Sequence, residues 1–484
     1  MEQKKSALSG FLSYFYGNFI VLILGFIQTP LVTRIMSTDE YGRTGMFETA
    51  VSCIYIFAVL GLDQAYIRYY YKQGIDRDKL MRQCLFPPLC IVSGLIVLYC
   101  FMSTYVNNWL FGRSSVDITL LVAGYTIISV FERFLFLDVR MQQNGKLYSN
   151  INIAQKVLNI LLIFAAFAFL KDDFRVVLYA MTFSWGSTTL FLLLRKLLSG
   201  RKEVSEPEGR RDYPETELIT YGAPFIMVLL MEWLLSSCDR IALKTWSDYN
   251  ELGVYSAAMK IMVLLLTFKN TFLAYWSPVA MEKYESGDEG SREFFRKAFD
   301  IVRFLCMGAA MGMILFRGLI VLLLGKDYRG ADRIIPFLTL LPIFAIMFEI
   351  TVQGIKFQKK NLYLNIASFI TITVNIIGNM CLVPVFGGVG AALTTGLSYV
   401  IYFIAGSFFA EKVYPVGYDY VRTAMDAAIL ILYAAFASFY RDDFVITLAG
   451  ILLITAILFI EWQNVTMIAD YLKIRIIHRG STNG

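Results

Sequence analysis

The stretch LYLNIASFITITVNIIGNMCLVP, residues 362–384, contains no charged side chain. A helix needs about 20 mostly apolar residues to cross the hydrocarbon core of a bilayer, so this stretch predicts a transmembrane helix. Thirteen similar stretches lie near residues 11–33, 45–67, 84–105, 117–138, 150–170, 175–194, 218–241, 254–276, 299–323, 331–352, 388–410, 421–439 and 444–462. The sequence therefore predicts an all-α, multi-pass membrane protein with about fourteen transmembrane helices, or twelve if the shortest stretches do not cross.

The composition excludes a water-soluble protein. Hydrophobic residues make up 57% of the 484 residues and charged residues only 17%, which is too little polar surface for a soluble body of this size. The single histidine, His478, lies in the C-terminal tail, and the seven cysteines form no CxxC pair. We therefore expect no metal site, no cofactor and no catalytic residues, and we expect neither an enzyme nor a nucleic-acid-binding protein.

The distribution of lysine and arginine predicts the orientation in the membrane. If the N-terminus is cytoplasmic, the inner loops collect most of the basic residues, as in residues 68–82 and 195–211. Basic loops resist translocation across the membrane. We therefore expect both termini in the cytoplasm and the chain in the cell (inner) membrane, with short outer loops such as residues 171–175 and 440–444.

An internal repeat divides the chain. Residues 131–160 and residues 348–376 share one pattern of short motifs. In order, these motifs are F-E, then R/K-x-Q, then L-Y-x-N-I, and finally N-I. Six spans per copy is an even number, so both copies enter the membrane in the same sense and form a parallel repeat. The expected parts are a six-helix lobe (1–200), a cytoplasmic linker (201–217), a second six-helix lobe (218–410), two further helices (411–462) and a cytoplasmic tail (463–484).

Five groups of short motifs recur in a characteristic order over about the first 410 residues. They are TPLVTR with EYG (29–34, 40–42), GLD with RYY (61–63, 68–70), YGAP (221–224), SSCDR with LGVYS (236–240, 252–256) and VPVFGGVGAA (383–392). Together they resemble the polysaccharide-biosynthesis branch of the multidrug/oligosaccharidyl-lipid/polysaccharide (MOP) superfamily, the Wzx-type flippases.

This resemblance implies a MATE-like fold and a function in cell-surface polysaccharide biosynthesis, such as O-antigen or capsule export. It implies a two-lobed exporter that moves polyprenyl-diphosphate-linked sugar units from the inner to the outer leaflet by alternating access. The partners implied are the lipid-linked oligosaccharide, membrane lipids and other polysaccharide-assembly proteins.

Basic residues in or beside the spans suit an anionic headgroup, because fixed cations replace the water that a diphosphate loses inside a membrane. The candidate cleft cations are Arg34, Arg68, Arg240, Lys260 and Lys269. Lys260 and Lys269 are nine positions apart on one predicted helix and lie on opposite faces, so both line one cleft only if that helix bends. A local ion pair between Asp239 and Arg240 is the alternative for Arg240.

Other polar features of the spans have structural alternatives. Glu132, Glu349 and Asp63 are candidates for ion coupling, since a carboxyl group inside the membrane can carry a proton or bind sodium, but pairing with a nearby arginine or lysine is the alternative. Arg303 lies near the cytoplasmic edge and is expected to extend its side chain to the interface. Gly308 and Gly312 are expected to permit close packing of two helices.

Two other functions stay open. A drug or metabolite cation antiporter of the same superfamily would share the fold, although an acid-rich cleft is then expected. A membrane glycan polymerase or glycosyltransferase is disfavoured by the short outer loops and by the missing catalytic constellation.

Overall fold

A computed structural model describes residues 2–72, 74–198, 213–286 and 290–461, with side chains from Gly17 onward except that of Ala274. Every regular element in these ranges is a helix, and the chain contacts group them into two compact units, Met1–Ser256 and Ala257–Gly484. The expectation of an all-α fold is confirmed.

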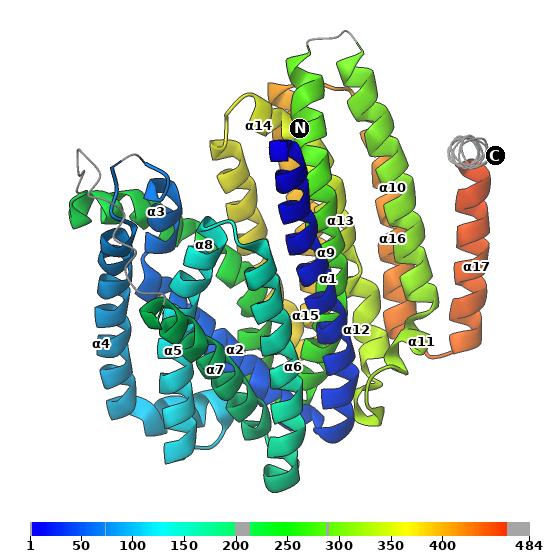
Figure 1. Cartoon of the computed structure of the whole chain (residues 1–484). Coiled ribbons are helices and arrows are strands. Elements are labelled where there is room, and N and C mark those ends of the chain that lie inside the picture. Colours follow the sequence, from blue (N-terminus) through cyan, green and yellow to red (C-terminus); the bar gives the residue numbers. More distant parts are fainter. Residues whose placement is uncertain (1, 73, 199–212, 287–289, 462–484) are drawn as a thin grey trace, which may run out of the picture. The chain divides into compact units, whose positions relative to one another are not determined.

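The first unit contains eight complete helices and the start of a ninth. They are α1 (Glu2–Ile35), α2 (Thr38–Val59), α3 (Leu62–Tyr69), α4 (Arg77–Phe111), α5 (Val116–Met141), α6 (Gly145–Leu170), α7 (Arg175–Leu198), α8 (Glu215–Trp246) and the first residues of α9 (Tyr249–Glu285). Within this unit α1 packs on α6, α6 on α7, and α7 on α5 (Figure 1).

The second unit contains the rest of α9 and the remaining elements. These are α10 (Ser291–Leu315), α11 (Arg317–Val321), η1 (Lys326–Tyr328), α12 (Ala331–Leu338), α13 (Leu340–Thr351), α14 (Gln353–Phe357), α15 (Leu362–Val413), α16 (Tyr420–Phe439) and α17 (Asp443–Ile460). α12 and α13 pack on α15, and α17 stands at the edge of the unit beside α10 (Figure 1).

The number of membrane crossings depends on two breaks. Twelve described helices are long and apolar enough to span a membrane, and a thirteenth span results if α2 and α3, bent by 53° at Leu60 and Gly61, count as one. The 52 residues of α15 are about 78 Å of helix, far more than the roughly 30 Å of a bilayer core. Its backbone is non-helical at Gly387.

The chain reverses direction at that break. A Cβ atom placed on Gly378 would lie 2.7 Å from Thr394, and one on Gly390 would overlap the carbonyl oxygen of Leu382. Residues eight and sixteen positions apart approach this closely only if the two halves of α15 run side by side in opposite directions. Counted this way, the helices account for all fourteen predicted spans.

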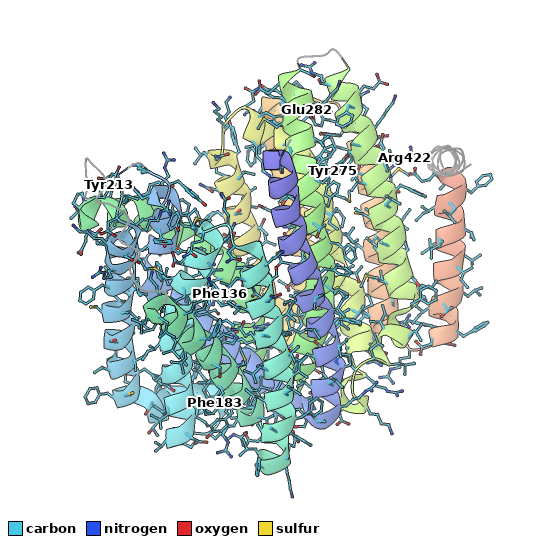
Figure 2. All side chains as sticks on the ribbon, in the orientation of Figure 1. Phe136, Phe183, Tyr213, Tyr275, Glu282 and Arg422 are labelled. Atoms are coloured by element: carbon cyan, nitrogen blue, oxygen red, sulfur yellow. The ribbon has the colours of Figure 1, made fainter. Side chains whose placement is uncertain are left out.

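Lipid is the natural solvent for the outer surface of both units. Large apolar side chains are exposed along many helices, among them Phe183 of α7 and Tyr275 of α9, which are 58% and 71% exposed (Figure 2). Exposed apolar surface of this extent is unfavourable in water and expected in a membrane. The protein is therefore a multi-pass membrane protein.

The contacts of α8 differ from the predicted division into lobes. The sequence places residues 218–241 in the second lobe, whereas α8 packs on α2 and α3 within the first unit. The contact depends on two glycines, because a Cβ atom on Gly222 would lie 2.8 Å from the carbonyl oxygen of Leu60 and one on Gly61 would overlap the backbone of Gly222. The lobe limits inferred from the repeat stay a prediction.

Candidate functional site

A buried carboxylate of α5 is held by neutral side chains. Glu132 is 6% exposed, and Gln155 Nε2 of α6 donates to its Oε1. Thr188 Oγ1 of α7 lies 3.4 Å from the same oxygen and accepts from Gln155 Nε2 at 3.0 Å. Among the described residues no lysine or arginine forms an ion pair with Glu132, so the pairing alternative does not apply to this residue.

The polar contacts continue along the same helices. Gln28 Nε2 of α1 donates to Asn159 Oδ1 of α6 at 3.0 Å, and Asn159 Nδ2 donates to Ser184 Oγ of α7 at 3.3 Å. Gln28 Oε1 is buried and has no hydrogen-bond partner in the described part of the chain. Polar groups inside a membrane are costly unless they are satisfied, so a row of them around one carboxylate indicates function.

Asp63, the second coupling candidate in the first unit, has a cationic partner. Arg133 of α5 donates to Asp63 Oδ2 from Nη2 at 2.6 Å and from Nε at 3.1 Å. Asp63 is 2% exposed, and the backbone N–H of Gln64 donates to its other oxygen at 2.9 Å. For Asp63 this arrangement matches a structural ion pair, which was the alternative to ion coupling, since the guanidinium of Arg133 already balances the carboxylate.

Glu349 of α13 lies between two lysines. Lys269 Nζ of α9 is 3.5 Å from Glu349 Oε1, and Lys356 Nζ of α14 donates to Oε2 at 3.2 Å. Glu349 and Lys356 are seven residues apart on a nearly continuous helical path, and seven residues are about two turns, so both side chains share one face. The lysine side chains are 24% and 35% exposed, against 12% for the carboxylate.

Arg240 lies in the first unit and contacts α2. Its Nη1 is 3.5 Å from Glu48 Oε2 and 3.4 Å from Thr49 Oγ1. Its neighbour Asp239 is 2% exposed and accepts a hydrogen bond of 2.5 Å from the hydroxyl of Tyr255. Asp239 thus accepts from a tyrosine hydroxyl of α9, and Arg240 contacts side chains of another helix.

The remaining predicted cations occupy different settings. Arg34 at the end of α1 and Arg68 near the end of α3 are exposed, and Lys260 on α9 is half-buried. Of the predicted site residues, the structure thus brings together Lys269 and Glu349 and adds Lys356 to them. The repeat contained a signal for Lys356, because a basic residue, Arg140, also follows Glu132.

Two expectations about α10 are wrong. Arg303 does not reach the interface: its side chain is buried, its Nη2 donates to Glu461 Oε1 at 2.9 Å, and its Nη1 donates to Asp426 Oδ2. These carboxylates, from α16 and the end of α17, were too distant in sequence to be recognised as partners. A Cβ atom on Gly308 or Gly312 would meet no atom of the described residues within 4 Å, so neither glycine permits a close helix contact in this part of the chain.

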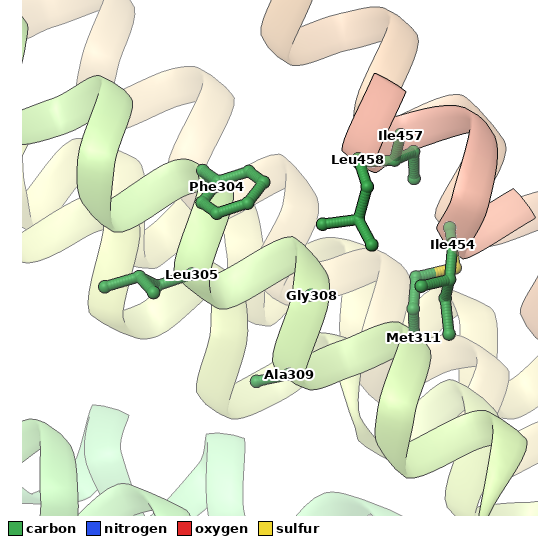
Figure 3. Close-up of a pocket in the computed structure, with 8 residues that line it drawn as sticks. All are labelled: Phe304, Leu305, Gly308, Ala309, Met311, Ile454, Ile457 and Leu458. Carbon is green, nitrogen blue, oxygen red and sulfur yellow. The ribbon is translucent and has the colours of Figure 1, made fainter. Parts of the chain in front are cut away.

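A pocket of about 250 Å³ lies between α10 and α17 (Figure 3). Its lining is apolar, with Leu305 and Met311 on α10 and Ile454 and Leu458 on α17 among its residues. The pocket offers no charged or hydrogen-bonding side chain to a diphosphate. The charged groups at Glu349 are therefore the better candidate for contact with a polar headgroup.

The comparison with known families agrees with the motifs. Residues 7–283, more than half of the chain, match the family described as polysaccharide biosynthesis protein. The chain belongs to the polysaccharide biosynthesis protein family. The resemblance of its motifs to polysaccharide-biosynthesis proteins is thereby confirmed.

The relatives of this family member have low sequence identity to it but match over most of their length. A capsular polysaccharide biosynthesis protein, CapF, of Staphylococcus aureus is 20% identical over 416 residues, which are 83% of this chain and 98% of the relative. An uncharacterized membrane protein of Methanocaldococcus jannaschii is 23% identical over 447 residues, 85% of each chain.

Solved structures share the fold of this polysaccharide biosynthesis family member. The lipid II flippase MurJ in an inward closed conformation superposes with a TM-score of 0.65 at 16% identity, covering 94% of this chain and 99% of that one. An inward-facing MATE family multidrug resistance transporter of the MOP superfamily gives a TM-score of 0.61 at 17% identity, covering 85% and 96%. The expected MATE-like fold is confirmed.

Proposed function

We propose that this protein flips a polyprenyl-diphosphate-linked oligosaccharide from the cytoplasmic to the outer leaflet by alternating access. The reaction serves cell-surface polysaccharide biosynthesis, with other assembly proteins supplying and using the lipid-linked sugar. Family membership and the relative named for capsule biosynthesis support the glycan, and the fold neighbour named as a lipid II flippase supports a lipid-linked substrate.

The observation that carries this proposal is the pair of lysines at Glu349. Two ammonium groups from α9 and α14 within 3.5 Å of one carboxylate of α13 give a polar site with net positive charge where these three helices meet. A diphosphate needs such groups because it loses water when it enters the membrane. Arg34, Arg68, Arg240 and Lys260 remain proposed contacts for the same headgroup at other stages of transport.

For the driving force we propose proton coupling through Glu132. A buried carboxyl group with neutral donors can bind and release a proton without breaking an ion pair, whereas Asp63 and Glu349 would each leave a cation unbalanced on protonation. We further propose that the protein resides in the cell (inner) membrane with both termini in the cytoplasm, because the basic residues lie mostly in the corresponding loops.

Translocation in liposomes tests the proposal. The purified protein is reconstituted with a polyprenyl-diphosphate oligosaccharide whose sugar carries a fluorophore, and a membrane-impermeant quencher reports the leaflet. Protein-dependent movement that falls at least severalfold in Lys269→Gln, and is unchanged in Lys146→Gln, which changes an exposed lysine of α6, supports the flippase. Protein-dependent uptake of organic cations without lipid movement favours the antiporter that the MATE neighbours suggest.

A further inference from the structure

The two lysines and the carboxylate of Glu349 have the geometry of an occupied anion site. Each lysine approaches a different oxygen of the same carboxylate, Lys269 at 3.5 Å from Oε1 and Lys356 at 3.2 Å from Oε2. A phosphate group presents oxygens to two ammonium groups in a comparable way, and lysine side chains adapt readily because their stems are flexible.

The exposed fractions of the three side chains indicate the side from which a ligand would approach this site. The carboxylate is the most buried of the three side chains, at 12%, while the lysines are 24% and 35% exposed. A ligand approaching from outside the helix packing therefore meets the ammonium groups before it meets Glu349. Two further exposed lysines, Lys359 and Lys360, follow α14 and add positive charge along the approach.

The helix that bears Lys356 is fixed by aromatic packing. Phe357, next to Lys356, stacks on Tyr284 of α9 with ring centroids 4.3 Å apart. Gln358 Nε2 also donates to the Tyr284 hydroxyl at 3.0 Å. α14 is thus held against α9, which carries Lys269, so the spacing of the two lysines does not depend on Glu349 alone.

From these contacts we infer that Lys269 and Lys356 form a phosphate-binding site that Glu349 occupies when substrate is absent, and that the substrate's diphosphate displaces this carboxylate. The inference rests on the proposed function for the identity of the lipid. Without an internal anion, two partly buried ammonium groups would lie close together with no balancing charge, which is unfavourable. Glu349 therefore neutralises part of the charge of the empty site.

An internal carboxylate also makes the site selective. A phospholipid with one negative charge would replace one carboxylate charge by another, so its interaction with the lysines is little stronger than that of Glu349. A diphosphate has two or more negative charges and therefore competes effectively with Glu349 for both lysines. The site is thus tuned to a diphosphate headgroup against the phosphodiester lipids that surround it. Glu132, the corresponding residue of the first repeat copy, contacts neutral groups and offers no such site.

Binding of inorganic pyrophosphate and inorganic phosphate to the purified full-length protein tests this inference by calorimetry. Glu349→Gln is expected to tighten pyrophosphate binding about tenfold or more and to reduce the preference for pyrophosphate over phosphate, because the competing charge is removed. Lys269→Gln and Lys356→Gln should each weaken pyrophosphate binding at least tenfold, and Lys269→Arg should retain it. Glu232→Gln, which changes an exposed carboxylate of α8, is the control and should leave pyrophosphate binding unchanged.

Unchanged or weaker pyrophosphate binding in Glu349→Gln, measured on protein with the wild-type elution profile and unfolding temperature, would overturn the inference. Polyprenyl diphosphate in detergent should compete with pyrophosphate in the wild type, and failure to compete would also overturn it, because the ligand would then be a free phosphate compound. Lipid translocation by the wild-type protein is measured independently, so that loss of this inference leaves the flippase proposal standing.

Discussion

Glu132 and Glu349 correspond in the internal repeat, yet their carboxylates have opposite kinds of partner. Glu132 accepts from the amide of Gln155 and lies beside the hydroxyl of Thr188, whereas Glu349 lies between two ammonium groups. The two matched positions therefore have different electrostatic settings, one with neutral hydrogen-bonding partners and one with two cationic partners.

The first prediction concerns the coupling role of Glu132. Glu132→Gln resembles the protonated carboxyl group in shape but cannot release a proton, so we expect substrate binding to persist while the response of transport to a proton gradient is lost. Initial translocation rates in liposomes with and without an imposed gradient measure this. Glu232→Gln, which changes an exposed carboxylate of α8, is the control. Full gradient stimulation in Glu132→Gln would contradict proton coupling at this residue.

The second prediction concerns the buried arginine of α10. Arg303→Met removes the guanidinium that pairs with Asp426 and one of the two that pair with Glu461, and breaking a buried ion pair on one side costs about 3–5 kcal/mol. We expect a clear fall in the unfolding temperature in detergent. Arg422→Gln removes a half-exposed partner of Glu461 and should cost roughly 1 kcal/mol or less.

A triple replacement tests whether the loss of stability in Arg303→Met comes from unbalanced charge. Arg303→Met combined with Asp426→Leu and Glu461→Leu removes the three most buried charges of the cluster and leaves the more exposed Asp300 and Arg422. An apolar replacement of a buried ion cluster is often neutral or stabilising. Recovery of the unfolding temperature is therefore expected. A triple variant as unstable as Arg303→Met would indicate that Arg303 contributes through its shape and not through its charge.

The third prediction concerns a glycine contact between α2 and α9 in the first unit. A Cβ atom on Gly253 would overlap the carbonyl oxygen of Thr38, and backbone cannot move aside as a flexible side chain does. Gly253→Ala should destabilise the protein by roughly 1–3 kcal/mol, as overpacking does. Gly308→Ala, where the added atom meets nothing, is the control and should stay within about 0.5 kcal/mol of the wild type. Equal unfolding temperatures for the two variants would argue against a close α2–α9 contact.

The fourth prediction concerns orientation. A reporter enzyme that is active only outside the cytoplasm should be active when fused within residues 171–175 or 440–444 and inactive when fused within residues 68–82. The physical reason is that lysine- and arginine-rich loops resist translocation. Activity in the opposite loops would reverse the topology and the proposed direction of transport.

The sequence predicted the fold well because membrane insertion depends on local composition. Each span is a continuous apolar stretch of sufficient length, which can be recognised without knowing its neighbours. The break inside α15 was also predicted, since the expected spans 362–384 and 388–410 leave a gap between them and the break at Gly387 lies in that gap. The assignment of α8 to the second lobe differs from its contacts, because packing on α2 and α3 depends on glycines that are far apart in sequence.

The sequence singled out individual residues of the candidate site but did not predict which of them contact one another. Lys269 and Glu349 were recognised singly, as charges that a membrane does not tolerate without a role. Their contact, and the addition of Lys356, depends on the packing of α9 against α13 and α14. Arg303 shows the same limit, since its carboxylate partners lie 123 and 158 positions away.

By itself the sequence determined the membrane-spanning architecture and the family, because the length of apolar stretches and the short motifs are local properties of the chain. The charge of the loops is also local, and it predicts the orientation. Only the tertiary structure decided which charges neutralise one another and which buried carboxylate has neutral partners. The physical reason is that the energy of an intramembrane charge depends on the groups within a few ångströms of it, and the packing of distant helices brings those groups together.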